Sequence, residues 1–416
     1  MFECTALPDG PRVISARVPG SRSVSVAAYV LAGSRHEGPG QAGVAHFMEH
    51  ITFKGTAAYP TTRVISEAIE GVGGSFNAAT ERESTVYWVR VPARQAARGV
   101  DVLGELIVRP KLEDAEIDHE RTVIVEEIRS YLDDPSEYAQ ILLQQALFGS
   151  GPMGREICGD EADIRGLPEQ TIRDFWAATY RPTNIVVAVA GDLDHDAALA
   201  LVEPAFGRGA GARTAYVAAP SLPAGERYLL GHRDASQAQL ALAVPAYRRD
   251  HPDTWSLAVM NGVLGDGMSS RLFLSVREER GLAYDVGSGI TEYTDAGSLS
   301  IYAGVDPKGL EAALAAILAE LERLRDELAR AKAYLSGGLE LRMDDSRHVA
   351  SWLGGQEALH DRVLTLEEAL AAIDAVRPED IQRVAGELFR DELLRMAVVA
   401  PPRHGERLDQ ALRLRA

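Results

Sequence analysis

Residues 46–50 of this 416-residue chain read HFMEH, and the interpretation of the sequence begins from this pentapeptide. Residues four apart on an α-helix point the same way, so His46 and His50 would share one face, about 6 Å apart along the axis. Two imidazoles placed in this way can bind one metal ion. Glu49 lies beside that face, where a carboxylate can accept a proton from a water molecule that the metal activates.

A histidine pair at this spacing is, taken alone, more often a structural pair than a metal site. The glutamate favours a metal site over a structural pair, because a chance HxxEH would occur in only about 2% of shuffled chains with this many histidines. The order HxxEH inverts the commoner HExxH, and both orders occur among zinc enzymes. The pentapeptide therefore favours a metal centre.

Such a centre needs a third protein ligand and leaves a fourth position to water. Cys4 and Cys158 lie in no close-spaced metal pattern, so we expect neither thiol to be a ligand. A helix predicted over residues 113–132 offers carboxylates instead. Glu120 and Glu127 share one of its faces, and Glu126 points about 100° away from Glu127. Periodicity does not choose between Glu126 and Glu127, and an acidic run of this kind is most often a solvated helix face.

The two halves of the chain repeat one order of elements: strand, helix, helix, strand pair, helices, strand. This repeat predicts an α+β fold of two similar tandem domains, each a mainly antiparallel sheet covered by helices. In the first half we expect strands over 12–18, 23–32, 75–80, 84–91 and 184–190, and helices from 42 and over 62–72, 93–108, 113–132, 136–147 and 194–206. In the second half we expect strands over 237–245, 283–290, 297–305 and 394–400, and helices over 251–264, 271–279, 308–324 and 325–335, with more up to 388.

A stretch rich in glycine, alanine and proline, residues 207–225, separates the halves and is the best candidate for a linker. We therefore expect a metal-binding domain over 1–210, a linker over 211–225 and a homologous domain over 226–416. The second domain has no counterpart of the histidine pair, since residues 255–264 read WSLAVMNGVL. One metal site per chain follows.

Composition bounds the functions further. Hydrophobic residues make up 46% and charged residues 25%, values typical of a folded globular protein. The formal net charge of −18 repels nucleic acid and anionic membrane surfaces, so we expect neither as a partner. No apolar run is long enough to span a bilayer, and the first residues show no signal-peptide pattern. We therefore expect a cytoplasmic protein.

Three further stretches extend the pattern: ITFKGT at 51–56, GGSFNA at 73–78 and ERTVIVEEI at 120–128. Together with HFMEH they resemble the M16 (pitrilysin/insulysin) metallopeptidase family, and most closely mitochondrial processing peptidase and its bacterial relatives. The resemblance covers nearly the whole chain. It implies that each chain forms half of a clamshell, that Glu127 is the third metal ligand, and that Glu120 orients a ligand from outside the coordination shell.

The second half resembles the family's domain without metal through GDGMSSRL at 265–272 and REERGLAY at 277–284. The resemblance implies that Arg277 and Tyr284 polarise the substrate carbonyl and hold the peptide, with Arg280 as the nearest competitor. From the residues alone, an arginine paired with nearby acids and a tyrosine packed in a strand explain the pattern better. The resemblance also implies a substrate-binding edge strand that begins at Asn77 and Ala78.

Motif and resemblance together predict a zinc-dependent endopeptidase that hydrolyses short or unfolded peptides inside a chamber formed by two chains. One Zn²⁺ per chain is expected, although such ligands also accept cobalt or manganese. A homodimer is expected because the chain carries both sets of residues, and a heterodimer with a homologous chain is the alternative. The competing function is a non-catalytic peptide-binding or assembly subunit of an M16-type heteromer. A protease dedicated to maturing one peptide would share the same chemistry.

Overall fold

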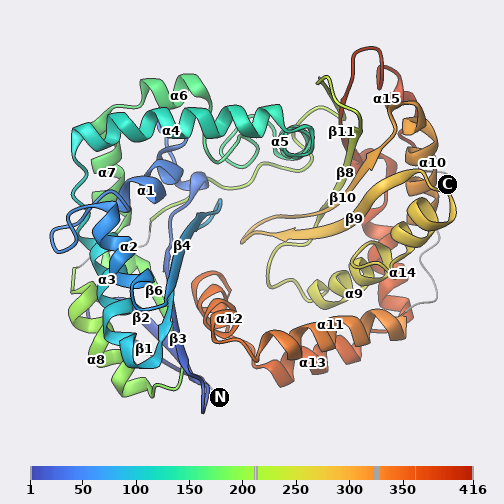
Figure 1. Cartoon of the computed structure of the whole chain (residues 1–416). Helices are drawn as coiled ribbons and strands as arrows, with labels where there is room; N and C mark the ends of the chain where they lie inside the picture. Colours follow the sequence, from blue (N-terminus) through green and yellow to red (C-terminus); the bar gives the residue numbers. More distant parts are fainter. Residues whose placement is uncertain (1, 210, 212–213, 323–327, 361, 415–416) are drawn as a thin grey trace. The chain divides into compact units, whose positions relative to one another are not determined.

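The computed structural model describes residues 2–209, 211, 214–322, 328–360 and 362–414. The chain forms two compact units, each with its own sheet and helices on the faces of that sheet, which confirms the predicted α+β class (Figure 1). Unit 1 comprises Met1–Ile128, Glu156–Val217 and Glu340–Thr365. Unit 2 comprises Arg129–Arg155, Ala218–Leu339 and Leu366–Ala416.

The sheet of unit 1 has six strands in the order β1-β2-β6-β3-β5-β4. Neighbouring strands run antiparallel except β2 and β6, which are parallel. Strand β4 lies at an edge of this sheet, so one side of its backbone pairs with no other strand of the described sheet. The strands are β1 (Phe2–Ala6), β2 (Arg12–Arg17), β3 (Ser23–Val30), β4 (Ser75–Thr80), β5 (Thr85–Pro92) and β6 (Ile185–Gly191).

Helices cover both faces of this sheet. Helices α3 and α8 pack on one face and α12 packs on the other, as Figure 1 shows. Strand β6 is buried at every position, which explains why its sequence, IVVAVAG, is apolar without alternation. The helices are α1 (Val44–Thr52), α2 (Thr62–Glu70), α3 (Ala96–Val108), α4 (Asp114–Asp133, in this unit up to Ile128), α6 (Glu161–Gly166), α7 (Glu169–Thr179), α8 (His195–Phe206) and α12 (Ser346–Leu359).

Unit 2 is built on a five-stranded sheet in the order β7-β11-β8-β10-β9. Strands β7 and β11 are parallel and the other pairs are antiparallel. The strands are β7 (Tyr228–His232), β8 (Ala238–Ala246), β9 (Ala283–Glu292), β10 (Gly297–Val305) and β11 (Arg395–Ala400). The helices are α5 (Pro135–Phe148), α9 (Thr254–Leu264), the π-helical turn η4 (Phe273–Glu279), α10 (Leu310–Leu321), α11 (Leu328–Arg342, in this unit up to Leu339), α13 (Leu366–Ala375), α14 (Pro378–Leu388) and α15 (Leu408–Ala411).

Two helices pack on sheets that chain order does not predict. Helix α5 comes from the first half of the chain and packs on β7, β8 and β11 of unit 2. Helix α12 comes from the second half and packs on β2, β3 and β6 of unit 1. The compact units therefore differ from the ranges 1–210 and 226–416 at these segments. The physical reason is that an apolar helix face is buried equally well by either sheet, so periodicity predicts the helix and not its partner.

Other differences are smaller. Strands β1 and β7 and helices α6 and α7 were not expected from the sequence. The described part of the predicted linker, residues 211 and 214–225, contains no helix or strand, and residues 212 and 213 lie outside the described residues. Residues 323–327, where two predicted helices adjoin, also lie outside them. Within the described parts of the chain, no helix is both long enough and apolar enough to cross a membrane.

Helix α12 packs closely on the sheet at Gly354, where there is no room for a side chain. A Cβ atom there would lie 2.5 Å from Tyr29 Cε2 and 2.8 Å from Ala188 Cβ, whereas at Gly355 the nearest atom would be Tyr29 Oη at 3.7 Å. We therefore expect Gly354→Ala to destabilise unit 1 by about 1–3 kcal/mol. The neighbouring Gly355→Ala should stabilise it by up to about 1 kcal/mol, because alanine favours the helix over glycine.

Denaturant unfolding followed by tryptophan fluorescence measures this difference. Three of the four tryptophans, Trp88, Trp176 and Trp352, lie in unit 1 and report on its unfolding. Opposite shifts of the midpoint for the two variants are the expected result. Shifts of the same sign and size would contradict the placement of α12 on this sheet.

Candidate metal centre

Helix α1 carries HFMEH, and two features fix its position. The Glu37 carboxylate accepts hydrogen bonds from the backbone N–H groups of Gly43 and Ala45, at 3.2 and 3.0 Å. These donors lie at the N-terminus of the helix, where N–H groups have no partner within the helix. The apolar residues of α1 are almost completely buried: Val44, Ala45, Phe47, Met48 and Ile51. Because that face is in the core, the rotation of the helix is set and the histidine face is set with it.

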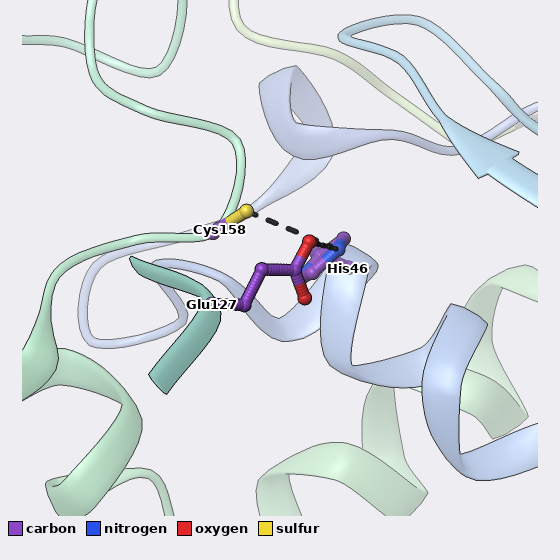
Figure 2. A group of neighbouring side chains, drawn as sticks. All are labelled: His46, Glu127 and Cys158. Atoms are coloured by element: carbon purple, nitrogen blue, oxygen red, sulfur yellow. Dashed lines mark hydrogen bonds and ion pairs between the residues drawn. The ribbon is translucent and has the colours of Figure 1, made fainter. Parts of the chain in front are cut away.

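The two histidines meet a carboxylate from α4. Their ring centroids lie 4.5 Å apart. Glu127 Oε1 lies 3.8 Å from His46 Nε2, and Glu127 Oε2 lies 3.3 Å from His50 Nε2. Ligand atoms held at about 2.0–2.3 Å from one ion in tetrahedral geometry lie about 3.3–3.8 Å from one another. Each of these two nitrogen–oxygen distances therefore suits a pair of ligands on one metal ion, and Figure 2 shows His46 and Glu127 facing each other.

Periodicity left open whether Glu126 or Glu127 of α4 faces the histidines. In the structure Glu127 contacts both histidines, whereas Glu126 is exposed. The resemblance pointed to Glu127, and the structure places that residue, about two helical turns after Glu120, beside the two histidines.

Glu120, from the same helix, contacts the other nitrogen of His50. Its Oε1 accepts a hydrogen bond from His50 Nδ1 at 2.8 Å, and its Oε2 pairs with Lys54 Nζ. This contact fixes the ring so that Nε2 is directed to Glu127. A carboxylate behind a metal-binding histidine is a common arrangement, because it sets the tautomer and the orientation of the ring.

The pKa shifts follow from these contacts. Burial would raise the pKa of Glu120, but its hydrogen bonds to His50 and Lys54 lower it below its ordinary value. Burial lowers the pKa of His46 to about 4, and the neighbouring His50 contributes in the same direction. For His50, burial is outweighed by the hydrogen bonds to Glu120 and Glu127, which raise its pKa to about 9. A metal ion binds neutral imidazole, so binding must displace the proton of His50.

Glu120→Gln is expected to weaken zinc binding about 10–100-fold, the usual effect of losing such a partner. The glutamine keeps the shape of the side chain but not the negative charge that polarises the His50 ring. Competition with a chromophoric chelator measures the affinity. Glu113→Gln, an exposed glutamate just before α4, is the matched control and should bind zinc as the parent does. Unchanged affinity in Glu120→Gln would show that this carboxylate does not support the metal.

Glu49 connects α1 to the edge strand β4. Its Oε2 accepts a hydrogen bond of 2.6 Å from Thr80 Oγ1. Burial raises the pKa of Glu49, and the hydrogen bond from Thr80 offsets part of that rise. A carboxylate with a raised pKa is suited to accept and return a proton. Asn77 and Ala78 lie on the same strand, where the Ala78 N–H donates to Asn77 Oδ1 at 2.9 Å.

Cys158, which we did not expect to be a ligand because it lies in no close-spaced metal pattern, is close to the centre. Its Sγ lies 3.9 Å from His46 Nε2, and donor atoms of His46, Glu127 and Cys158 lie within 4.8 Å of one another (Figure 2). Cys158 belongs to the segment between α5 and α6, 112 positions after His46, so no local pattern connects the two. Burial raises the pKa of the Cys158 thiol, and nearby carboxylates add to the rise. Cys4 is exposed.

The other two predicted catalytic residues lie in unit 2. Arg277, in η4, places its Cζ 5.8 Å from the ring centroid of Tyr284 and 4.6 Å from that of Phe273. Tyr284, in β9, is 74% exposed, so it is not packed into the strand face as the purely structural interpretation required. Arg277 Nε also lies 3.7 Å from Glu278 Oε1, so the predicted pairing of this arginine with an acid is present.

Known proteins resemble this chain in sequence over most of its length. Residues 12–161 match the model of the insulinase family (peptidase family M16), and residues 167–335 match that of the peptidase M16 inactive domain. An uncharacterized zinc protease of Mycobacterium leprae is 35% identical over 99% of this chain and 94% of its own length. The chain belongs to peptidase family M16. An uncharacterized zinc protease of Bacillus subtilis is 32% identical over 94% of this chain and 97% of its own length.

Solved structures show the same M16 fold. A protease from Helicobacter pylori has a TM-score of 0.87 at 23% identity and covers 96% of this chain and 99% of its own. The peptidase M16 inactive domain from Pseudomonas fluorescens has a TM-score of 0.86 at 21% identity, with 96% and 98% covered. The resemblance read from the sequence is therefore confirmed. The word "inactive" for the domain matched by residues 167–335 agrees with α9, which has no histidine.

Proposed function

We propose that this M16 family member is a zinc-dependent endopeptidase that hydrolyses short or unfolded peptides. One observation carries the proposal: Glu127 lies 3.8 Å from His46 Nε2 and 3.3 Å from His50 Nε2, and Glu49, on the same helix as both histidines, is hydrogen-bonded to an edge strand. The donor set, two imidazoles and a carboxylate, suits zinc in a catalytic site. Relatives that carry the name zinc protease support the same metal.

Each residue has a defined task in this proposal. His46, His50 and Glu127 would hold the ion, which when bound activates water and polarises the scissile carbonyl. Glu120 keeps the His50 ring in place through Nδ1. Glu49 takes the proton of the attacking water and passes it to the leaving amine. The burial that raises the pKa of Glu49 favours the protonated form that this second step needs.

The peptide would bind along β4. An extended segment can add to a free sheet edge through backbone hydrogen bonds that need no particular side chain. Ala78 would supply these bonds through its backbone and Asn77 would contact the peptide through its side chain, so the Ala78 N–H would exchange its bond with Asn77 Oδ1 for one with the peptide. Thr80 is two residues further along β4 and bonds Glu49, so a peptide on this strand runs towards the base.

We extend the proposal to Arg277 and Tyr284, whose guanidinium and phenol groups can donate to a developing oxyanion and hold the peptide. The exposure of Tyr284 leaves its hydroxyl accessible for this task.

We further propose a homodimer that forms a closed chamber with one zinc ion per chain. The net charge of −18 favours basic peptides, an attraction that salt should weaken.

The test is to incubate the zinc-loaded protein with a mixture of unstructured peptides and to read the products by mass spectrometry. Internal cuts that a chelator abolishes and added zinc restores are the expected result. A zinc-loaded protein that binds these peptides without cutting them would favour the non-catalytic peptide-binding subunit instead.

A further inference from the structure

Cys158 places a fourth donor atom at the candidate metal centre. Its Sγ lies 3.9 Å from His46 Nε2, close to the spacing of about 3.5 Å expected between a nitrogen and a sulfur ligand of one zinc ion. Sγ also shares the group of metal-binding atoms within 4.8 Å with His46 and Glu127. That group does not include His50, whose Nε2 lies 3.3 Å from Glu127 Oε2, so one nitrogen, a carboxylate and a sulfur lie together and a second nitrogen adjoins the carboxylate.

The neighbours of the sulfur show a built site. Cys158 is 4% exposed and His46 is 8% exposed. The buried Nδ1 of His46 has no hydrogen-bond partner among the described residues, so the ring makes its polar contacts through Nε2, the atom that faces both Glu127 and Cys158. The Nε2 atom of this buried ring is thus directed at two further donor atoms, an arrangement that a shared cation would stabilise.

The segment that carries Cys158 is packed closely on the start of α1. A Cβ atom at Gly43 would lie 2.4 Å from the Cys158 carbonyl oxygen, and a Cβ at Gly159 would lie 3.0 Å from the Ala42 carbonyl oxygen. Both glycines have positive φ angles, 83° and 72°, which side chains disfavour. The backbone at Cys158 and Gly159 is therefore held against the start of the helix that carries the histidines, and the sulfur is held with it.

We propose that Cys158 is a fourth protein ligand, which closes the coordination shell of the metal in the substrate-free protein. The inference rests on the metal centre of the proposed function. On binding, the thiol releases its proton to solvent, a bond forms between Sγ and the ion, and the sulfur takes the position that water would otherwise occupy. The resting site is then a closed one, and peptide cleavage requires the sulfur to leave so that water can enter.

Cobalt substitution tests this assignment without an activity assay. Apoprotein is titrated with Co²⁺ in the absence of oxygen, and the near-ultraviolet charge-transfer absorption of a cobalt–thiolate bond is recorded. We expect this absorption to rise to saturation at one equivalent in the parent and in Cys4→Ser, the control for the other cysteine. We expect its loss in Cys158→Ser and Cys158→Ala, with one equivalent of cobalt still bound by equilibrium dialysis.

The outcomes separate the two proposals. Cobalt bound at one equivalent without thiolate absorption in the parent would overturn the role of Cys158 and leave the metal centre intact. No cobalt bound by the parent would overturn both. X-ray absorption of the zinc-loaded parent needs no variant: a sulfur neighbour at about 2.3 Å supports the proposal, and a shell of nitrogen and oxygen alone contradicts it.

Discussion

Glu49→Gln is expected to reduce kcat/KM for peptide cleavage by a factor of at least about 10²–10⁴, the usual contribution of a general base. The glutamine keeps the size of the side chain and an oxygen that can still accept the hydrogen bond from Thr80 Oγ1. It cannot accept the proton of the attacking water. Initial rates on an internally quenched fluorogenic peptide measure the effect.

Two controls make this result specific. The variant should bind zinc at the parent's stoichiometry and unfold at the parent's temperature, because Glu49 is not among the ligands. Glu70→Gln, an exposed glutamate at the end of α2, should cleave at the parent's rate. Equal cleavage by Glu49→Gln and the parent would mean that another group is the base or that a contaminating protease cleaves the peptide. Loss of zinc with loss of activity would assign Glu49 a structural role instead.

Local geometry explains the parts of the site that the sequence predicts. That His46 and His50 share a face requires only the helical repeat, and the helix itself follows from the buried apolar residues around the motif. The strand pair predicted over 75–80 and 84–91 is found at Ser75–Thr80 and Thr85–Pro92, because alternation marks a strand with unlike faces. These features depend on neighbours within a few positions of the chain.

The parts that were missed depend on contacts distant in the sequence. Cys158 was set aside because nothing near it in sequence resembles a metal site, and its partner His46 lies 112 positions earlier. The exchange of α5 and α12 was missed for a related reason, since an apolar helix face does not specify which sheet buries it. Glu126 and Glu127 point about 100° apart on α4, but the periodicity of that helix does not say which of the two directions faces the histidines of α1.

Glu127→Gln is expected to lose zinc affinity by more than the 10–100-fold typical of a partner outside the coordination shell, and to lose peptide cleavage with it. The reason is electrostatic: in the proposed ligand set of His46, His50 and Glu127, the two imidazoles are neutral and this carboxylate supplies the charge that opposes the divalent ion. Glutamine keeps an oxygen near His46 and His50 but not that charge.

Glu126→Gln is the sharpest control for this experiment, because it makes the same change one residue away on the same helix. It should retain zinc after dialysis against a competing chelator and should cleave peptides at the parent's rate, since its side chain is exposed. The two variants have the same net charge, so a general effect of removing one negative charge would appear in both. Loss of zinc in Glu126→Gln with retention in Glu127→Gln would reverse the assignment. Equal loss in both would show that the charge of α4 as a whole, rather than one ligand, holds the ion.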